Sequence, residues 1–213
     1  MIAKKEKYII GIDEVGRGAL AGNVTVAAVA LPKNLKLKTG NLKLRDSKKL
    51  TPKQREIWFK YITRMNTDKR GLAVCYAIAN VSPKVIDRIN ISKAANLAAT
   101  RALNKLIVNR QSRIGKCGVF LDGGLYLNTK YKIQDTKYKI QTVIRGDEKI
   151  PAISLASIIA KVSRDRQMKN LHKKYSQYGL ERHKGYGTKK HFKAIKKHGP
   201  SKIHRLTFLR KMR

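Results

Sequence analysis

Acidic residues are scarce in this chain, so their positions carry information. The 213 residues hold 13 Asp and Glu against 49 Lys and Arg. Four of the acids lie where an apolar run ends or a helical pattern is about to begin: Asp13, Glu14, Asp122 and Asp147. A buried carboxylate is costly unless it is paired, hydrogen-bonded or bound to a cation. Taken singly, each acid is best explained as a strand-end turn residue or helix cap; as a set they indicate a shared site.

Metal-assisted hydrolysis is the chemistry that such a set supports. Strands that end in acids can bring them together at one edge of a sheet. Mg²⁺ and Mn²⁺ prefer oxygen ligands and keep waters or substrate phosphates in the remaining positions. Two such ions about 3.5–4 Å apart can activate a water and stabilise the leaving oxygen of an in-line displacement. The four acids therefore predict a Mg²⁺ or Mn²⁺ site, with two ions when substrate is bound.

The elements that must hold these acids are strands alternating with helices. Apolar runs predict strands at residues 8–12, 24–31, 72–79 and 118–121, the last ending at Asp122. Helices are expected from a capping box at Thr51-Pro52-Lys53-Gln54, from Ser82-Pro83, over 91–109 and over 153–171. This order predicts an α/β domain with a mixed sheet flanked by helices over residues 1–170. Shorter basic helical pieces broken by glycine predict a small C-terminal helical extension, 171–213, packed on the same domain.

Charge indicates the partner. The formal net charge of +36 implies a polyanion, because Lys and Arg that contact phosphates release condensed counterions. A generally Lys-rich composition explains part of the excess, and no basic amphipathic helix suggests a membrane surface. From Arg166 to Arg213 there are 16 Lys and Arg and one acid, Glu181. This quarter of the chain is the best candidate for a surface that binds a nucleic-acid backbone.

Cysteines and hydropathy indicate the compartment. Cys75 and Cys117 lie far apart beside apolar runs, as buried free thiols of a reducing compartment do, and no Cys/His spacing suggests zinc. The N-terminal apolar run is too short for a signal peptide, and no stretch approaches transmembrane length. We expect a cytoplasmic monomer.

A tandem repeat lies between Asp122 and Asp147. TKYKIQD at 129–135 is followed directly by TKYKIQT at 136–142. One copy can form a strand, and the other is expected in a longer hairpin or loop. A one-residue slip would turn the side chains to the opposite face, whereas a seven-residue loop costs little entropy.

A series of motifs resembles the ribonuclease HII family in order along nearly the whole chain. They are GIDEVGRGALAG (11–22), RDSKKLTPKQR (45–55), IDRINI (86–91), LDG (121–123), RGDEKIPAISLASIIAKVSRD (145–165), HKGYGTKKH (183–191) and HGPSKIHRLTF (198–208). GRG after DEV is similar to ribonuclease HII rather than HIII, whose extra N-terminal domain has no room here. The chain departs from the family pattern at the second glycine after Asp122 and in the longer segment that holds the repeat.

The resemblance implies an RNase H-like fold and cleavage of RNA in RNA–DNA hybrids. It also implies incision 5′ of single ribonucleotides in duplex DNA, leaving 3′-hydroxyl and 5′-phosphate ends, as in ribonucleotide excision repair. Carried over, the catalytic and metal-binding residues are Asp13, Glu14, Asp122 and Asp147. The residues that would bind substrate are Gly16, Arg17 and Gly18 at the ribose and its 2′-hydroxyl, Tyr186 at the sugar of the RNA–DNA junction, and Ser47 and Lys48 at a phosphate. A sliding clamp is a possible partner, although the terminal RKMR shows no clamp-binding motif.

Simpler roles remain open for several residues. Tyr186 could anchor a loop, Lys48 could be a solvated charge, and Arg17 could pair with an acid. Asp165 is as well explained by a structural ion pair, and Asp46 and Glu148 by supporting or solvent-facing roles.

Two other classes of protein also remain open. A non-catalytic basic protein would need only the charge. A metal-independent ribonuclease would use histidines as acid and base. All five histidines fall in the basic tail. None forms a recognisable catalytic arrangement in the sequence, so phosphate contact or loop packing is the expected role.

Overall fold

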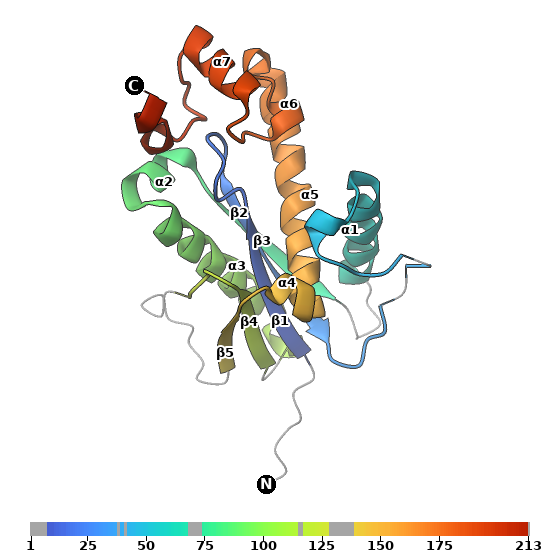
Figure 1. Ribbon diagram of the computed structural model, residues 1–213. Coiled ribbons are helices and arrows are strands. Elements are labelled where there is room, and N and C mark those ends of the chain that lie inside the picture. The colour runs from blue at the N-terminus through green and yellow to red at the C-terminus, as the bar shows by residue number, and fades with distance from the viewer. Residues whose placement is uncertain are drawn as a thin grey trace.

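A five-stranded mixed sheet forms the centre of the computed structural model, which describes residues 8–37, 39–40, 42–67, 74–114, 117–127 and 139–212 (Figure 1). Its strands are β1 (Tyr8–Val15), β2 (Val24–Pro32), β3 (Cys75–Val81), β4 (Cys117–Asp122) and β5 (Lys139–Val143). They lie in the order β3-β2-β1-β4-β5. β2 pairs antiparallel with β1 and β3, whereas β4 pairs parallel with β1 and β5. The predicted mixed sheet is confirmed.

Helices cover both faces of the sheet (Figure 1). They are α1 (Pro52–Thr67), α2 (Pro83–Ile89), α3 (Ile91–Ile114), α4 (Gly146–Lys149), α5 (Pro151–Lys174), α6 (Leu180–His183) and α7 (Lys189–His198). Short 3₁₀ turns are η1 (Ser47–Lys49), η2 (Ser176–Tyr178) and η3 (Leu206–Met212). The predicted capping box opens α1: Gln54 N donates to Thr51 Oγ1 over 3.2 Å, and Thr51 N donates to Gln54 Oε1 over 2.9 Å. Within the described residues, no helix is both long and apolar enough to cross a membrane.

Strand β2 explains why two hydrophobic layers form. Every one of its residues is buried, and successive side chains of a strand point to opposite faces. Val26 and Ala28 therefore join a core with α2 and α3, whereas Ala27 and Val29 join a core with α1 and α5. Each fully buried Val contributes roughly 1.5–3 kcal/mol, so these layers hold the central strands in place. Both cysteines, Cys75 and Cys117, are buried, as predicted.

Strand β1 is longer than predicted. It runs to Val15 because Asp13, Glu14 and Val15 continue the ladder with Ala27, Val26 and Thr25 of β2. The first two acids therefore lie inside a strand rather than after one. Pairing with a neighbour overrides the polar character of these residues, which had indicated a strand end.

Several other boundaries also shift. β3 is described from Cys75 to Val81, α3 continues to Ile114, and α5 continues to Lys174. Of the duplicated heptads, residues 129–138 lie outside the described residues. Lys139 to Thr142 of the second copy form most of β5, in register with residues 118–121 of β4.

The segments after α5 surround a third, smaller hydrophobic cluster. It combines side chains from the C-terminal pieces with one from α5 and two from the loop after β1: Leu20, Ala21, Met168, Tyr178, Leu180, Ile195, Ile203 and Leu209. Figure 1 shows α6, α7 and η3 gathered near the far end of α5 and the β1–β2 loop. The C-terminal pieces therefore support the loop that carries the GRG motif.

Candidate active site

Three of the four predicted carboxylates lie together. One oxygen of each of Asp13, Asp122 and Asp147 lies within 4.8 Å of the others. Strands β1 and β4 are parallel neighbours whose last paired residues are Ile12 and Leu121, so the next residue on each strand is an aspartate. Asp147 comes from α4, and Gly146 N of the same turn donates to Asp122 Oδ1 over 2.7 Å. That hydrogen bond links the turn to the sheet.

The electrostatics of the cluster favour a cation. Burial raises the pKa of Asp13 well above its usual range, and the neighbouring Glu14 and Asp122 raise it further. Burial and the charge of Asp122 likewise raise the pKa of Asp147. Lys48 Nζ lies 3.6 Å from Asp147 Oδ2, but its side chain is largely exposed, so it compensates little of the negative charge. A divalent cation would restore the balance.

Glu14 is the fourth acid, and it lies outside that group of three. Its Oε1 accepts a hydrogen bond from Arg17 Nη1 over 3.2 Å. Burial raises the pKa of Glu14, whereas Arg17 lowers it. Within the described part of the chain its Oε2 is buried without a hydrogen-bond partner, which a folded protein rarely tolerates. The donor set is all oxygen, and one of its oxygens lacks a partner, so these residues fit Mg²⁺ or Mn²⁺.

Two serines on α5 form hydrogen bonds to the segments that surround the acid cluster. Ser154 Oγ donates to the main-chain oxygen of Asp147 over 2.5 Å, and Ser157 Oγ lies 2.8 Å from Ser47 Oγ. The sequence reasoning missed both serines. Their signal was available, because two serines fall on the buried side of a helix that begins just after an acid.

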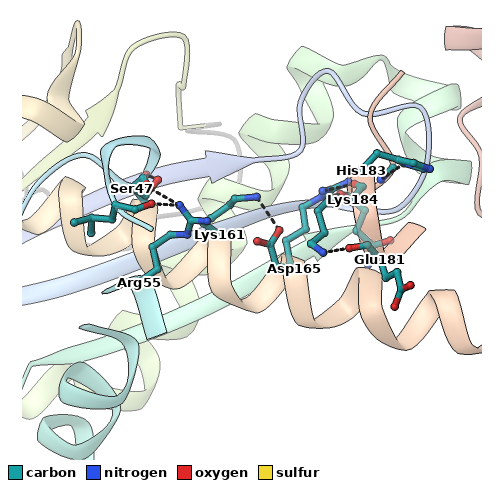
Figure 2. A network of polar contacts seen from close by, with 12 residues as sticks. Ser47, Arg55, Lys161, Asp165, Glu181, His183 and Lys184 are labelled. Carbon is teal, nitrogen blue, oxygen red and sulfur yellow. Dashed lines mark hydrogen bonds and ion pairs between the residues drawn. The ribbon is translucent and has the colours of Figure 1, made fainter. Parts of the chain in front are cut away.

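The η1 turn carries both predicted phosphate-binding residues, Ser47 and Lys48, but only one of them has an exposed side chain. Ser47 is buried against Ser157. Arg55 Nη1 donates to the main-chain oxygen of Ser47 over 2.7 Å, as Figure 2 shows. Asp46 caps the turn by accepting from Lys48 N over 2.9 Å, a supporting role. Ser47 therefore shapes the turn, whereas the side chain of Lys48 is exposed beside the acids.

The GRG loop follows β1 directly. Arg17 forms the structural ion pair with Glu14, and it also donates to Gly124 O over 3.2 Å and to Ser92 Oγ over 3.1 Å. The departure from the family pattern at Gly124 therefore faces Arg17. Gly18 is exposed, with open space where a Cβ would lie, so its backbone is accessible to a ligand.

Tyr186 lies in the loop after α6, and its side chain is 37% exposed. Its ring packs over the guanidinium of Arg164, 5.5 Å from Cζ to the ring centroid. Leu20 N and Ala21 N, from the loop after β1, both donate to Gly185 O, over 2.8 and 3.2 Å. The tyrosine and the GRG loop are thus carried by two segments that contact each other.

Three of the five histidines come together in the fold. The rings of His183 and His191 stack with centroids 4.3 Å apart, and His191 Nε2 lies 3.3 Å from His204 Nε2. Both His191 and His204 are buried, and burial lowers the pKa of His191 to about 4. His191 is therefore neutral at neutral pH, and both side chains lie away from solvent. The geometry fits loop packing rather than acid–base catalysis.

Two further acids near the motifs, Asp165 and Glu148, form ion pairs. Asp165 accepts from Lys161 Nζ over 2.8 Å on α5, as Figure 2 shows, and Glu148 accepts from Lys49 Nζ over 2.7 Å. Both acids have the supporting roles expected for them.

Carboxylates on two adjacent central strands of a mixed sheet flanked by helices are the arrangement expected of an RNase H-like fold. Residues 10–211 match the family model described as Ribonuclease HII. A ribonuclease HII of Caldicellulosiruptor bescii is 41% identical over 204 residues, which cover 96% of this chain and 87% of that one. The chain belongs to the ribonuclease HII family and is an enzyme of the ribonuclease H type.

Solved structures share the fold. The crystal structure of the ribonuclease H2 from Pyrococcus horikoshii OT3 aligns with a TM-score of 0.73 and 26% identity, covering 96% of each chain. Bst-RNase HIII in complex with Mn²⁺ aligns with a TM-score of 0.70 and 21% identity, covering 95% of this chain and 67% of that one. The second likeness concerns the fold alone.

Proposed function

We propose that this protein hydrolyses the RNA strand of RNA–DNA hybrids and also incises duplex DNA on the 5′ side of a single embedded ribonucleotide. The products would be a 3′-hydroxyl and a 5′-phosphate. The observation that carries the proposal is the cluster of Asp13, Asp122 and Asp147, with the unpartnered Oε2 of Glu14 beside it.

The four acids would hold Mg²⁺ or Mn²⁺, with two ions when substrate is bound. The Mn²⁺ in the Bst-RNase HIII complex is compatible with this choice. Bound cations would supply Lewis-acid stabilisation of the phosphorane-like charge and lower the pKa of a water. The carboxylates would hold these cations, and the hydrogen bond from Gly146 N to Asp122 Oδ1 would keep that carboxylate in place.

Substrate selection would use the backbone of Gly16, Arg17 and Gly18. Glycine permits close approach to a ribose, and the 2′-hydroxyl is the group that distinguishes RNA from DNA at a site. The half-exposed ring of Tyr186 would pack on the sugar at the junction, and Lys48 would contact a phosphate. We further propose that residues 171–213 are a basic extension that enlarges the duplex-binding surface of a catalytic domain spanning residues 1–170.

Removal of the metal tests this function against its rivals. EDTA should abolish cleavage of an RNA–DNA hybrid, and excess Mg²⁺ or Mn²⁺ should restore it, as followed by gel electrophoresis of an end-labelled RNA strand. Binding of the hybrid in EDTA, followed by fluorescence anisotropy, should persist because the basic surface is unchanged. Cleavage that survives EDTA would favour a histidine mechanism, and no cleavage under any metal would favour a non-catalytic binding protein.

A further inference from the structure

Two arginines are fully buried in the enzyme, and the mechanism above does not use them. Arg164 lies on α5 and Arg205 just before η3, and both have 0% of their surface exposed. Burial lowers the pKa of both guanidinium groups, to about 9 for Arg205, so Arg205 remains charged at neutral pH. A buried charge is costly unless its donors are satisfied, so these residues require an explanation.

Within the described part of the chain, both guanidinium groups donate only to main-chain carbonyls. Arg164 donates to Asn23 O over 3.1 Å, to Ala21 O over 3.0 Å and to Lys184 O over 2.8 Å. The acceptors therefore belong to two loops, the one after β1 and the one that carries Tyr186. A planar fork of donors suits this task, because it fixes several acceptors in one geometry.

Arg205 holds the same loop from the other side. Its Nη1 donates to Arg17 O over 2.8 Å, and its Nε and Nη2 donate to Gly22 O over 3.1 and 2.9 Å. Asp87 on α2 accepts from the first residues of η3, Leu206 N and Thr207 N, and so keeps the segment after Arg205 in place. The middle residue of the GRG motif is thus tied by its own carbonyl to the C-terminal segment.

Close packing makes the positions of these loops depend on Arg164. A Cβ at Gly16 would lie 2.1 Å from Arg164 Nε, and a Cβ at Gly185 would lie 2.5 Å from Ala21 O. Both glycines have a positive φ, +86° and +83°. The ring of Tyr186 rests over the same guanidinium. One side chain therefore contacts the start of the GRG loop and the tyrosine together.

We propose that Arg164 is a positioning residue that holds the GRG loop and Tyr186 in one relative geometry, with Arg205 as a second support. The selectivity of the enzyme for a ribonucleotide next to DNA depends on this geometry. The inference rests on the proposed function, in which the GRG backbone and the tyrosine contact neighbouring parts of the same junction. Among the described residues, neither guanidinium is hydrogen-bonded to any of the four carboxylates, so both arginines would act on the substrate through the loops that they hold.

Arg164→Lys is the informative variant, because lysine keeps the positive charge but lacks the planar set of N–H donors of a guanidinium. We expect kcat/KM on a duplex with one ribonucleotide to fall roughly 10- to 100-fold, because a small displacement of a group that positions the substrate can slow catalysis by this much. The kcat/KM on a continuous RNA–DNA hybrid, which offers no junction sugar to Tyr186, should fall much less. Affinity for Mn²⁺ without nucleic acid, from calorimetric titration, should match the wild type. Arg101→Lys, at an exposed position on α3, is the control and should leave kcat/KM on both substrates unchanged.

A double variant separates positioning from a general loss of structure. If Arg164 acts through Tyr186, Arg164→Lys with Tyr186→Ala should be no less selective than Tyr186→Ala alone, because coupled residues are not additive. Equal losses on both substrates in a folded Arg164→Lys variant, or additive losses in the double variant, would overturn the inference.

Arg205→Lys provides a second test if Arg164→Lys does not fold by circular dichroism. It should lower the ratio of kcat/KM on the single-ribonucleotide duplex to kcat/KM on the continuous hybrid, as expected for Arg164→Lys. Failure of both variants to fold would assign the arginines a purely structural role and would also overturn the inference. A wild-type protein that cuts neither substrate would instead contradict the proposed function.

Discussion

Replacing Asp13 with asparagine should reduce cleavage of an RNA–DNA hybrid by about a thousandfold or more while leaving hybrid binding intact. Asp13 lies in the acid cluster and is almost wholly buried. Metal-ion stabilisation of a transition state is worth several kcal/mol, and about 4 kcal/mol corresponds to about a thousandfold in rate. Single-turnover cleavage with Mg²⁺ and anisotropy binding in EDTA measure the two quantities separately.

The same substitution should not destabilise the metal-free protein. The pKa of Asp13 is raised in the folded state, so its ionised form opposes folding at neutral pH. The neutral amide removes the repulsion from Glu14 and Asp122, so the metal-free Tm should stay equal or rise. Asp165→Asn is the matched control, because Asp165 pairs with Lys161 outside the cluster. The Asp165→Asn enzyme should cleave the hybrid at the wild-type rate. Wild-type turnover in the Asp13 variant would remove Asp13 from the site.

Alanine at Gly16 and alanine at Gly18 should have different effects. Gly16 has a φ of +86°, and its Cβ would overlap Arg164, so Gly16→Ala should lower the free energy of unfolding by about 2 kcal/mol or more. Cleavage at a single ribonucleotide should fall at least about a hundredfold, because the whole loop must move. Chemical denaturation and kcat/KM give the two values.

Gly18→Ala isolates the contact with substrate from the stability of the loop. Nothing lies within 4 Å of a Cβ at Gly18, so the free energy of unfolding should stay within about 0.5 kcal/mol of the wild type. Activity should still fall, about 10-fold or more, if the backbone must press against a ribose. A fully active Gly18→Ala enzyme would show that the motif does not approach the substrate at this residue.

Strong local patterns made much of the fold predictable. The apolar run that became β2 and the capping box before α1 both appear in the structure as expected. Asp13, Asp122 and Asp147 could be grouped because acids are rare in this chain and stand out where an apolar run ends or a helical pattern begins. The identity of the partner strand could not be read in this way, since β1 contacts β4 across more than one hundred residues of sequence.

Long-range contacts made the rest unpredictable. Arg164 looks like one more basic residue of a long helix and Arg205 like one more in a basic tail. Only the fold shows their donors directed at carbonyls some 140 and 180 positions away. The length of β1 depended on β2, and the packing of His191 against His204 depended on the turn after α7. Pairing across the fold, rather than local propensity, decided each case.

The position of the cut in a labelled DNA duplex with one ribonucleotide tests the central claim most directly. With Mg²⁺ or Mn²⁺, we predict one incision on the 5′ side of the ribonucleotide, with a 3′-hydroxyl that a polymerase can extend and a 5′-phosphate on the other fragment. A cut on the 3′ side that leaves a cyclic phosphate, the product of attack by the 2′-hydroxyl, would contradict a metal-activated water. An uncut duplex with either metal would contradict the claim as well.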